Sequence, residues 1–230
     1  GETTSSMATI AAKQALQSAE LSAADLDLII CATTTPDQLI PATACMIQHK
    51  LGATRAAAFD LNTACTSFLY GLSTATAMIR SGVVQNAVVI GVELITRYMD
   101  WSNRNVAVLF GDGAAAVVLQ ASDEESGVLG SVLGCDAEGR QTLRVRGMGC
   151  GYAGLGISYG DTLWDFDGQA TFKRAVKGMS EASASVLAQC GVTAEQIDLA
   201  VPHQANLRII EAVAKYAGLP MDKVMVTVER

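Results

Sequence analysis

The chain has 230 residues, of which 50% are hydrophobic and 17% are charged, and its formal net charge is −7. It is long and apolar enough to bury a core, so a disordered chain is excluded. No apolar run approaches about 18 residues and no basic stretch is present, so we expect neither a membrane span nor a nucleic-acid interface. The first residues lack the basic and apolar regions of a signal peptide, so none is expected.

The first half of the chain alternates helical apolar spacing with short apolar runs that are typical of buried strands. The run DLDLIICATTT (25–35) predicts a strand buried on both faces, and Gly52 predicts the end of a short helix. We expect helices over residues 3–19, 43–52 and 65–80, and strands over residues 25–35, 56–62 and 86–93. This alternation predicts an α/β fold with a mainly parallel sheet that is covered on both faces.

The second half is less regular. Two β-rich runs flank a GDG turn in residues 106–120, a strand-like stretch follows over 127–136, and residues 139–163 form a glycine-rich excursion with Tyr152 and Tyr159. The GDG precedes a β-rich run and not a helix, which argues against a dinucleotide-binding loop. We expect helices over 168–190 and 205–218, and strands over 197–202 and 223–228.

Residues 15–33 align with residues 186–204 without a gap, so that Leu16 is aligned with Leu187 and Asp27 with Asp198. Each copy reads as a helix, a capped turn and a buried strand. The pattern favours a duplicated half-domain over a chance similarity of two helix–strand units. We therefore predict an N-terminal half over residues 1–125, and a linker excursion with a C-terminal half over residues 126–230.

Cys65 follows a predicted strand and opens a predicted helix. A helix N-terminus carries partial positive charge and unpaired N–H groups, which lower the pKa of a thiol and can hold an oxyanion. The alternative is a small buried hydrophobic residue, the usual state of a free cysteine. The six cysteines include no CxxC pair, and the sequence has only two histidines, so we do not expect a metal site. We expect the cysteines to be reduced thiols in a cytoplasmic protein.

His203 follows the predicted strand 197–202, and α/β sheets bind ligands beyond the carboxyl ends of their strands. Gln204 and Asn206 add polar groups there. A thiol and an imidazole at strand ends together favour acyl chemistry through a cysteine nucleophile. Arg104, in a polar loop before a predicted strand, is either a phosphate ligand or a solvated side chain.

Five stretches resemble the 3-oxoacyl-[acyl-carrier-protein] synthase III family of the thiolase-like superfamily. They are DLDLIICATTTPD, AAFDLNTACTSFLYGL, VLFGDGAAAVVL, LWDFDGQATFKRAV and VPHQANLRIIEAVAKYAGLPMDKVMVTVER. The resemblance implies a thiolase-like fold of two duplicated βαβαβ-type half-domains in a layered αβαβα arrangement. It also implies that a preceding segment and a following catalytic asparagine lie outside this sequence, so the chain is expected to be truncated at both ends.

The resemblance implies an acyltransferase that condenses an acyl-CoA primer with malonyl-acyl carrier protein and so initiates fatty acid synthesis. The expected enzyme is a cytoplasmic homodimer that needs no metal or cofactor. The implied site residues are the nucleophile Cys65 and the catalytic His203; Arg104, Phe172 and Asn206 at the substrate; and Gln204, Ala205, Asn206, Leu207 and Arg208 at the carrier protein.

Two alternatives stay open. One is a related condensing enzyme of secondary metabolism that uses another acceptor, and the other is a non-catalytic acyl-binding fragment. Thr66 and Ser67, beside the predicted nucleophile, depart from the Ser or Ala followed by Gly that the family often has there. Because of such departures, the sequence does not predict which acyl chain length the enzyme prefers.

Overall fold

The computed structural model describes residues 1–124, 126–146, 151 and 163–228. They form two compact units, one of Gly1–Arg97 with Gly111–Gly127 and one of Tyr98–Phe110 with Val128–Arg230. Each unit is described by itself below. The predicted division into two half-domains at residue 125 stays a prediction.

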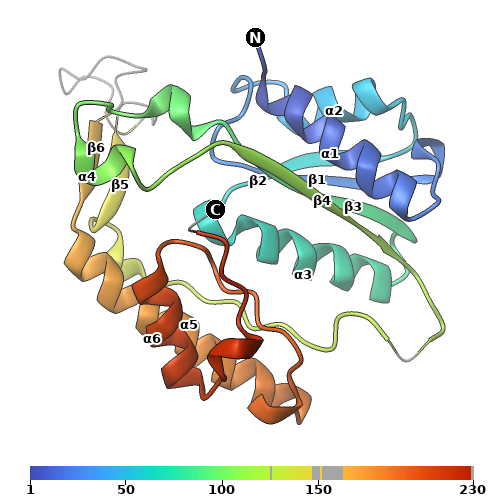
Figure 1. Cartoon of the computed structure of the whole chain (residues 1–230). Coiled ribbons are helices and arrows are strands. Elements are labelled where there is room, and N and C mark those ends of the chain that lie inside the picture. The colour runs from blue at the N-terminus through green and yellow to red at the C-terminus, as the bar shows by residue number, and fades with distance from the viewer. Residues whose placement is uncertain (125, 147–150, 152–162, 229–230) are drawn as a thin grey trace. The chain divides into compact units, whose positions relative to one another are not determined.

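The first unit is built on a four-stranded sheet with the order β2-β1-β3-β4 (Figure 1). Its strands are β1 (Leu28–Ala32), β2 (Ala57–Leu61), β3 (Asn86–Glu93) and β4 (Gly113–Gln120). β1 pairs in parallel with both β2 and β3, and β4 pairs antiparallel to β3. The predicted α/β class with a mainly parallel sheet is confirmed.

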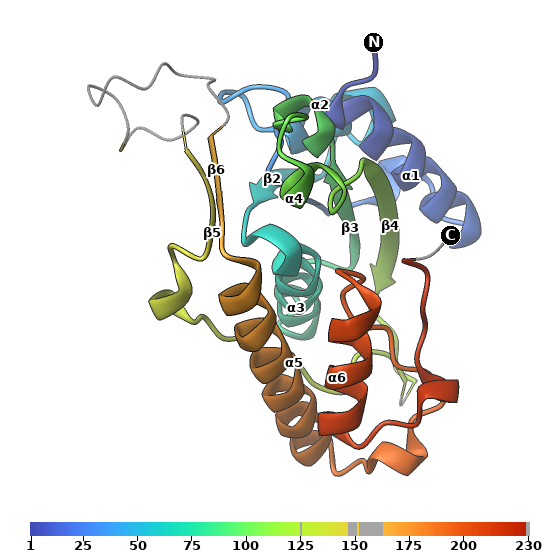
Figure 2. The same ribbon diagram turned by 60° about the vertical axis from the view of Figure 1, so that its left-hand side comes forward.

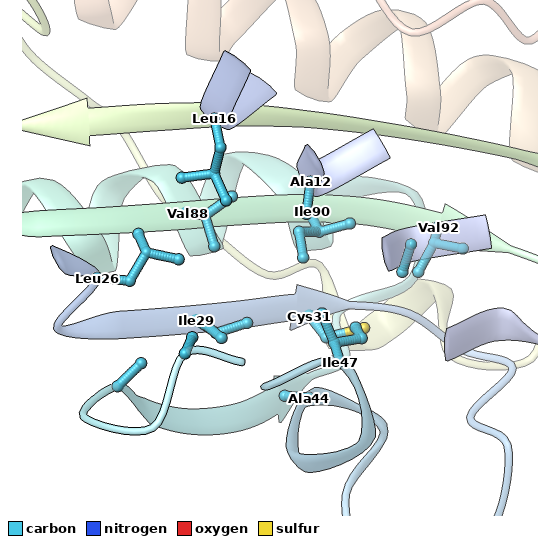
Figure 3. Packing of buried hydrophobic residues seen from close by; sticks show 13 residues of the cluster. Ala12, Leu16, Leu26, Ile29, Cys31, Ala44, Ile47, Val88, Ile90 and Val92 are labelled. Carbon is cyan, nitrogen blue, oxygen red and sulfur yellow. The ribbon is translucent and has the colours of Figure 1, made fainter. Parts of the chain in front are cut away.

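Helices cover both faces of this sheet because β1 is apolar on both faces. Successive strand residues point to opposite faces. Ile29 and Cys31 pack on the side of α1 (Thr4–Ser18) and α2 (Thr43–Leu51), as Figure 3 shows, whereas Leu28 and Ile30 pack on the side of α3 (Ser67–Arg80). Each fully buried Leu or Ile side chain contributes about 1.5–3 kcal/mol, so both faces stabilise β1.

A carboxylate at one end and a glycine at the other set the bounds of α2. The carboxylate of Asp60, on β2, accepts hydrogen bonds from the backbone N–H groups of Thr43 and Ala44, each at 2.7 Å. A negative charge at a helix N-terminus is favourable. At the other end, Gly52 takes a left-handed conformation with φ of 73° and stops the helix, as predicted.

The second unit contains a β-hairpin strand pair and two packed helices. β5 (Leu143–Arg146) pairs antiparallel with β6 (Leu163–Phe166). α5 (Gly168–Cys190) and α6 (Leu207–Ala217) lie side by side in Figures 1 and 2 and share an apolar cluster around Val176, Ile209 and Val213. Among the described residues of both units, the remaining elements are the short helix α4 (Arg104–Ala107) and the 3-10 turns η1 (Ala23–Asp25), η2 (Ala64–Thr66), η3 (Ile95–Tyr98), η4 (Ala137–Gly139), η6 (Ala194–Gln196) and η7 (Met221–Lys223).

The two copies of the sequence repeat have matching local structure. In each, a helix is followed by a 3-10 turn, η1 after Ser22 and η6 after Thr193. The next helix of each copy ends at a left-handed glycine, Gly52 or Gly218. Six residues after each glycine, Ala58 pairs in parallel with Ile29 of β1, and Val224 pairs in parallel with Ala200. The register of the pairing is therefore the same in both copies.

Several predicted strands are wrong. Residues 197–202 and 223–228 form only the bridge between Ala200 and Val224, because Pro202 has no N–H with which to continue a ladder. Residues 106 and 107 are the end of α4, which Asn103 caps, and residues 108 and 109 form the turn that follows it. Residues 127–136 are in no strand, and the glycines among them weaken strand formation.

The predicted excursion over residues 139–163 also contains regular structure, since β5 and the start of β6 lie within it. Arg144 and Arg146 of β5 both contact the carboxylate of Asp165 on β6, at 2.6 and 3.0 Å, and hold the strand pair together. Tyr152, Tyr159 and Cys150 lie outside the described residues.

Gly71 allows α3 to approach the sheet closely, as its small size predicts. A Cβ atom at this position would lie 2.9 Å from Val89 Cγ1 and 3.4 Å from Ile30 Cγ2. We expect Gly71→Ala to lower the free energy of unfolding by about 1–2 kcal/mol through overpacking. Gly178→Ala is the matched control, because nothing lies within 4 Å of the corresponding Cβ in α5. Urea denaturation measures both, and equal stability of the two variants would contradict the close approach.

Asp27 ties the start of β1 to β3. Its carboxylate accepts hydrogen bonds from the backbone N–H groups of Gln85 and Asn86 at 3.0 and 3.1 Å, and it pairs with Arg55 at 2.9 Å. These contacts, the backbone N–H groups first, hold the pKa of Asp27 below its usual 3.8. The stability they supply is present above the usual pKa and is lost as the pH falls through the lowered one. Asp27→Asn should therefore flatten the acid side of the stability–pH curve measured by denaturation, and an unchanged acid side would refute this.

Candidate active site

Cys65 lies on a strained turn between a strand and a helix. β2 ends at Leu61, η2 covers Ala64–Thr66, and α3 begins at Ser67. Ala64 has a positive φ of 53°, which is uncommon for a residue with a Cβ. Strain of this kind persists only where surrounding contacts hold the backbone. The structure thus places Cys65 where the sequence predicts it, and the residue is exposed.

Polar side chains of the turn itself hold this backbone. The hydroxyl of Ser67 accepts from the N–H of Thr63 at 2.7 Å, and the hydroxyl of Thr66 donates to the carbonyl of Thr63 at 2.8 Å. Asn62 accepts from the N–H of Ala64 at 3.1 Å. The residues at positions 66 and 67, which depart from the family pattern, therefore act as clamps on the turn.

The pKa of the Cys65 thiol is raised from its usual 9.0, so the expected lowering is wrong in sign. Partial loss of hydration is the largest cause, and the negative charge of Glu93 adds to it. The residue's own backbone N–H acts in the opposite direction but is outweighed. Because Cys65 keeps exposed surface, its hydration is reduced but not removed.

Glu93, which sequence reasoning missed, ends β3 in a polar network with the threonines that follow β1. Its carboxylate accepts from the N–H of Thr34 at 2.8 Å, from the hydroxyl of Thr34 at 2.7 Å and from the hydroxyl of Thr35 at 3.0 Å. Thr35 in turn accepts from the N–H of Leu94 at 2.9 Å. Two features of the sequence could have indicated this network: a glutamate at the end of one apolar run and three consecutive threonines at the end of another.

His203 stands between Pro202 and Gln204, three residues after the Ala200 bridge. Burial lowers the pKa of its imidazole below the usual 6.5. A lowered pKa favours the neutral ring at neutral pH, and a neutral ring has one N–H donor and one acceptor nitrogen. His203 is nevertheless exposed, so the loss of hydration that lowers its pKa is partial.

The remaining predicted residues also lie in the second unit, whereas Cys65 lies in the first. Arg104 is exposed at the start of α4, and Arg208 is exposed on the first turn of α6. Phe172 packs against the Val176 cluster. Asn206 caps α6, since its side chain accepts from the N–H of Ile209 at 3.0 Å. Ala205 also packs against that cluster, and Leu207 is the half-buried first residue of α6.

The described part of the chain contains no group of three or more His, Cys, Asp and Glu side chains that could hold a metal ion. None of the helices described is long and apolar enough to cross a membrane. Five cysteines are described and all are free thiols.

Alkylation with iodoacetamide tests the environment of Cys65. We expect the pH midpoint of its alkylation rate to lie above 9.0, because partial loss of hydration raises the pKa of this exposed thiol. Glu93→Gln should lower that midpoint only in part, since the charge is the smaller cause. Cys31 is the internal control, because it is buried and should not react in the folded protein. A Cys65 midpoint below 9.0 would show that the surroundings of the thiol do not raise its pKa.

Comparison with known families and proteins identifies the chain's relatives. Residues 59–137 match the family model of 3-oxoacyl-[acyl-carrier-protein (ACP)] synthase III, and residues 187–230 match its C-terminal model. The chain is 48% identical to beta-ketoacyl-[acyl-carrier-protein] synthase III 2 of Vibrio vulnificus, with 99% of this chain and 63% of that protein covered. It is 45% identical to beta-ketoacyl-[acyl-carrier-protein] synthase III of Roseiflexus sp., with 100% of this chain and 70% of that protein covered.

Solved structures agree with the thiolase-like fold. The crystal structure of 3-oxoacyl-[acyl-carrier-protein] synthase III from Aquifex aeolicus matches with a TM-score of 0.90 and 40% identity, over 100% of this chain and 70% of that one. The priming beta-ketosynthase of the R1128 polyketide biosynthetic pathway matches with a TM-score of 0.89 and 33% identity, over 99% and 67%. The chain thus spans between 63% and 70% of the length of these relatives. On this evidence it belongs to the 3-oxoacyl-[acyl-carrier-protein] synthase III family.

Proposed function

We propose that the protein is an acyltransferase that condenses an acyl-CoA primer with malonyl-acyl carrier protein to give 3-oxoacyl-acyl carrier protein, the first condensation of fatty acid synthesis. The observation that carries the proposal is the exposed Cys65 thiol on a clamped strand-to-helix turn. Family membership and the names of the relatives support it.

In the first step the sulfur of Cys65 attacks the thioester carbonyl of the acyl-CoA. A new S–C bond forms, the bond to the coenzyme A sulfur breaks, and an acyl-enzyme results. The raised pKa means that Cys65 is largely a thiol at neutral pH, so its proton must leave as the bond forms. The departing coenzyme A thiolate can take up that proton, which balances the step.

In the second step malonyl-acyl carrier protein loses CO₂, and the electron pair of the broken C–C bond becomes an enolate. The neutral ring of His203, whose pKa burial lowers, can donate a hydrogen bond to the enolate oxygen. The enolate carbon then attacks the acyl carbon, and the Cys65 sulfur leaves as a thiolate that takes a proton from water to restore the thiol. Backbone N–H groups of the turn at Cys65 are the proposed donors to the transient oxyanion.

Exposed cations suit the two acidic substrates. Arg104 is proposed to bind the phosphates of coenzyme A, and Arg208 to attract the acidic carrier protein to the stretch of residues 204–208. Phe172 is proposed to line the acyl channel. Asn206 uses its oxygen to cap α6, so its amide nitrogen is the group left to contact substrate.

The proposal needs no metal or redox cofactor, because the coenzyme A and carrier-protein thioesters supply the activated groups. It places the enzyme in the cytoplasm as a homodimer, in agreement with the free thiols. It also takes residues 1–125 and 126–230 as two duplicated halves, which the shared register of the two copies supports.

A second candidate is a condensing enzyme of secondary metabolism with another acceptor. The 33% identity and TM-score of 0.89 to a priming beta-ketosynthase of a polyketide pathway favour keeping it. Product formation with malonyl-acyl carrier protein but not with malonyl-CoA would support the first proposal, and the reverse would support the second.

Substitution of the nucleophile tests the proposal. In the full-length enzyme, Cys65→Ala should lower the rate of condensation by at least about 10³-fold, because no acyl-enzyme can form. Cys45→Ala, at another exposed cysteine, should leave the rate unchanged. Transfer of a radiolabelled acyl group from acyl-CoA to the Cys65→Ala protein would sink the assignment, and binding of acyl-CoA without turnover by the wild type would favour a non-catalytic role.

A further inference from the structure

The parallel pairing beside His203 stops after a single rung. The N–H of Ala200 donates to the carbonyl of Lys223 at 2.8 Å, and the N–H of Met225 donates to the carbonyl of Ala200 at 2.9 Å. In a parallel ladder the next rung would join residue 202 to the carbonyl of Met225 and the N–H of Thr227 to the carbonyl of residue 202. Residue 202 is a proline, which has no N–H to donate.

The side-chain amide of Gln204 contacts all of the groups that this missing rung would have joined. Its nitrogen donates to the carbonyl of Met225 at 3.0 Å, where the N–H of residue 202 would have donated. Its oxygen accepts from the N–H of Thr227 at 2.8 Å, in place of the carbonyl of Pro202. Its nitrogen also donates to that carbonyl of Pro202 at 3.0 Å.

The amide therefore behaves like an extra peptide group inserted between the two segments. Without it, the carbonyls of Pro202 and Met225 and the N–H of Thr227 would lose these partners. The contact to Pro202 is partly buried, whereas the contacts to Met225 and Thr227 are exposed, so water would replace the latter but would not join the two segments. With it, the segments stay joined but stand apart by the width of one amide. The hydroxyl of Thr227 adds a fourth contact to the Gln204 oxygen at 3.2 Å.

We propose that Gln204 is a positioning residue for His203, whose backbone it fixes by replacing a rung of the ladder with its side-chain amide. His203 lies between Pro202 and Gln204, and both neighbours are tied to the segment Met225–Thr227 through this amide. The functional part of the inference rests on the proposed role of His203.

The resemblance implies a different role for Gln204, namely a contact with the carrier protein. A glutamine amide offers two N–H donors and one oxygen with two acceptor sites. The contacts to Pro202, Met225 and Thr227 already use these groups. A carrier protein would have to break one of these contacts to bind the amide, whereas the exposed Arg208 can bind without such a loss.

Two variants of the full-length enzyme separate positioning from simple stabilisation. Gln204→Ala removes the inserted amide, and we expect Tm to fall by about 2–4 °C and kcat to fall about 10- to 100-fold. KM for the carrier protein should stay unchanged. Adding Pro202→Ala to Gln204→Ala restores an N–H at residue 202, so a direct rung can form. Tm should then recover while kcat should not, because the segments now stand closer and His203 is displaced.

A third measurement does not depend on catalysis. The rate at which diethyl pyrocarbonate modifies His203, followed by mass spectrometry, should differ from wild type in both variants. Failure of the wild type to condense acyl-CoA with malonyl-acyl carrier protein would refute the proposed function, and Tm and this modification rate would still decide the role of Gln204.

Three results would overturn the inference. In one, Gln204→Ala raises KM for the carrier protein with kcat unchanged, which indicates a binding contact. In another, the double variant recovers kcat together with Tm, which indicates a purely structural rung. In the third, both variants keep the wild-type Tm and the wild-type modification rate of His203.

Discussion

The burial of β1 between two parallel neighbours is the constraint on which the first unit depends. Every residue of β1 is buried, and the strand pairs with β2 on one edge and with β3 on the other. Parallel strands end at the same edge of a sheet, so the residues after Ala32, Leu61 and Glu93 emerge together. The turn that carries Cys65 and the threonine network around Glu93 are both consequences of that alignment.

The second copy of the repeat uses the same register with far less hydrogen bonding. Ala200 and Val224 correspond to Ile29 and Ala58 of the first copy, yet they form one bridge where β1 and β2 form five paired positions. The difference has a local cause, because Pro202 removes the donor that the next rung needs. A side-chain amide takes the place of that donor and leaves a residue with acid–base chemistry, His203, next to an interrupted ladder.

Local sequence patterns predicted the helices and strands whose formation depends on their own residues. The buried run of β1, the glycine that ends α2 and the long helix over residues 168–190 were predicted correctly. Contacts between distant segments were beyond such patterns. The network of Glu93 joins residues 59 positions apart, and the helix at 104–107 takes in residues 106 and 107, where the apolar run alone predicted the start of a strand.

The candidate site was likewise only partly predictable from the sequence. Its position was visible in the sequence, since Cys65 lies between a strand pattern and a helix pattern. The pKa shift of the Cys65 thiol could not be predicted from the sequence, because its direction depends on how much protein surrounds the thiol and on the charge of Glu93. The role of the Gln204 amide likewise depends on residues 225–227, which only folding brings beside it.

Cys65 is proposed to carry the acyl group during turnover. Mass spectrometry after brief incubation with acyl-CoA alone tests it most directly, because trypsin releases residues 56–80 as one peptide in which Cys65 is the one cysteine. We expect this peptide to gain the mass of one acyl group and to lose it after later addition of malonyl-acyl carrier protein. An acyl group found only on another peptide, or one that malonyl-acyl carrier protein leaves in place, would rule out Cys65 as the carrier of the acyl group.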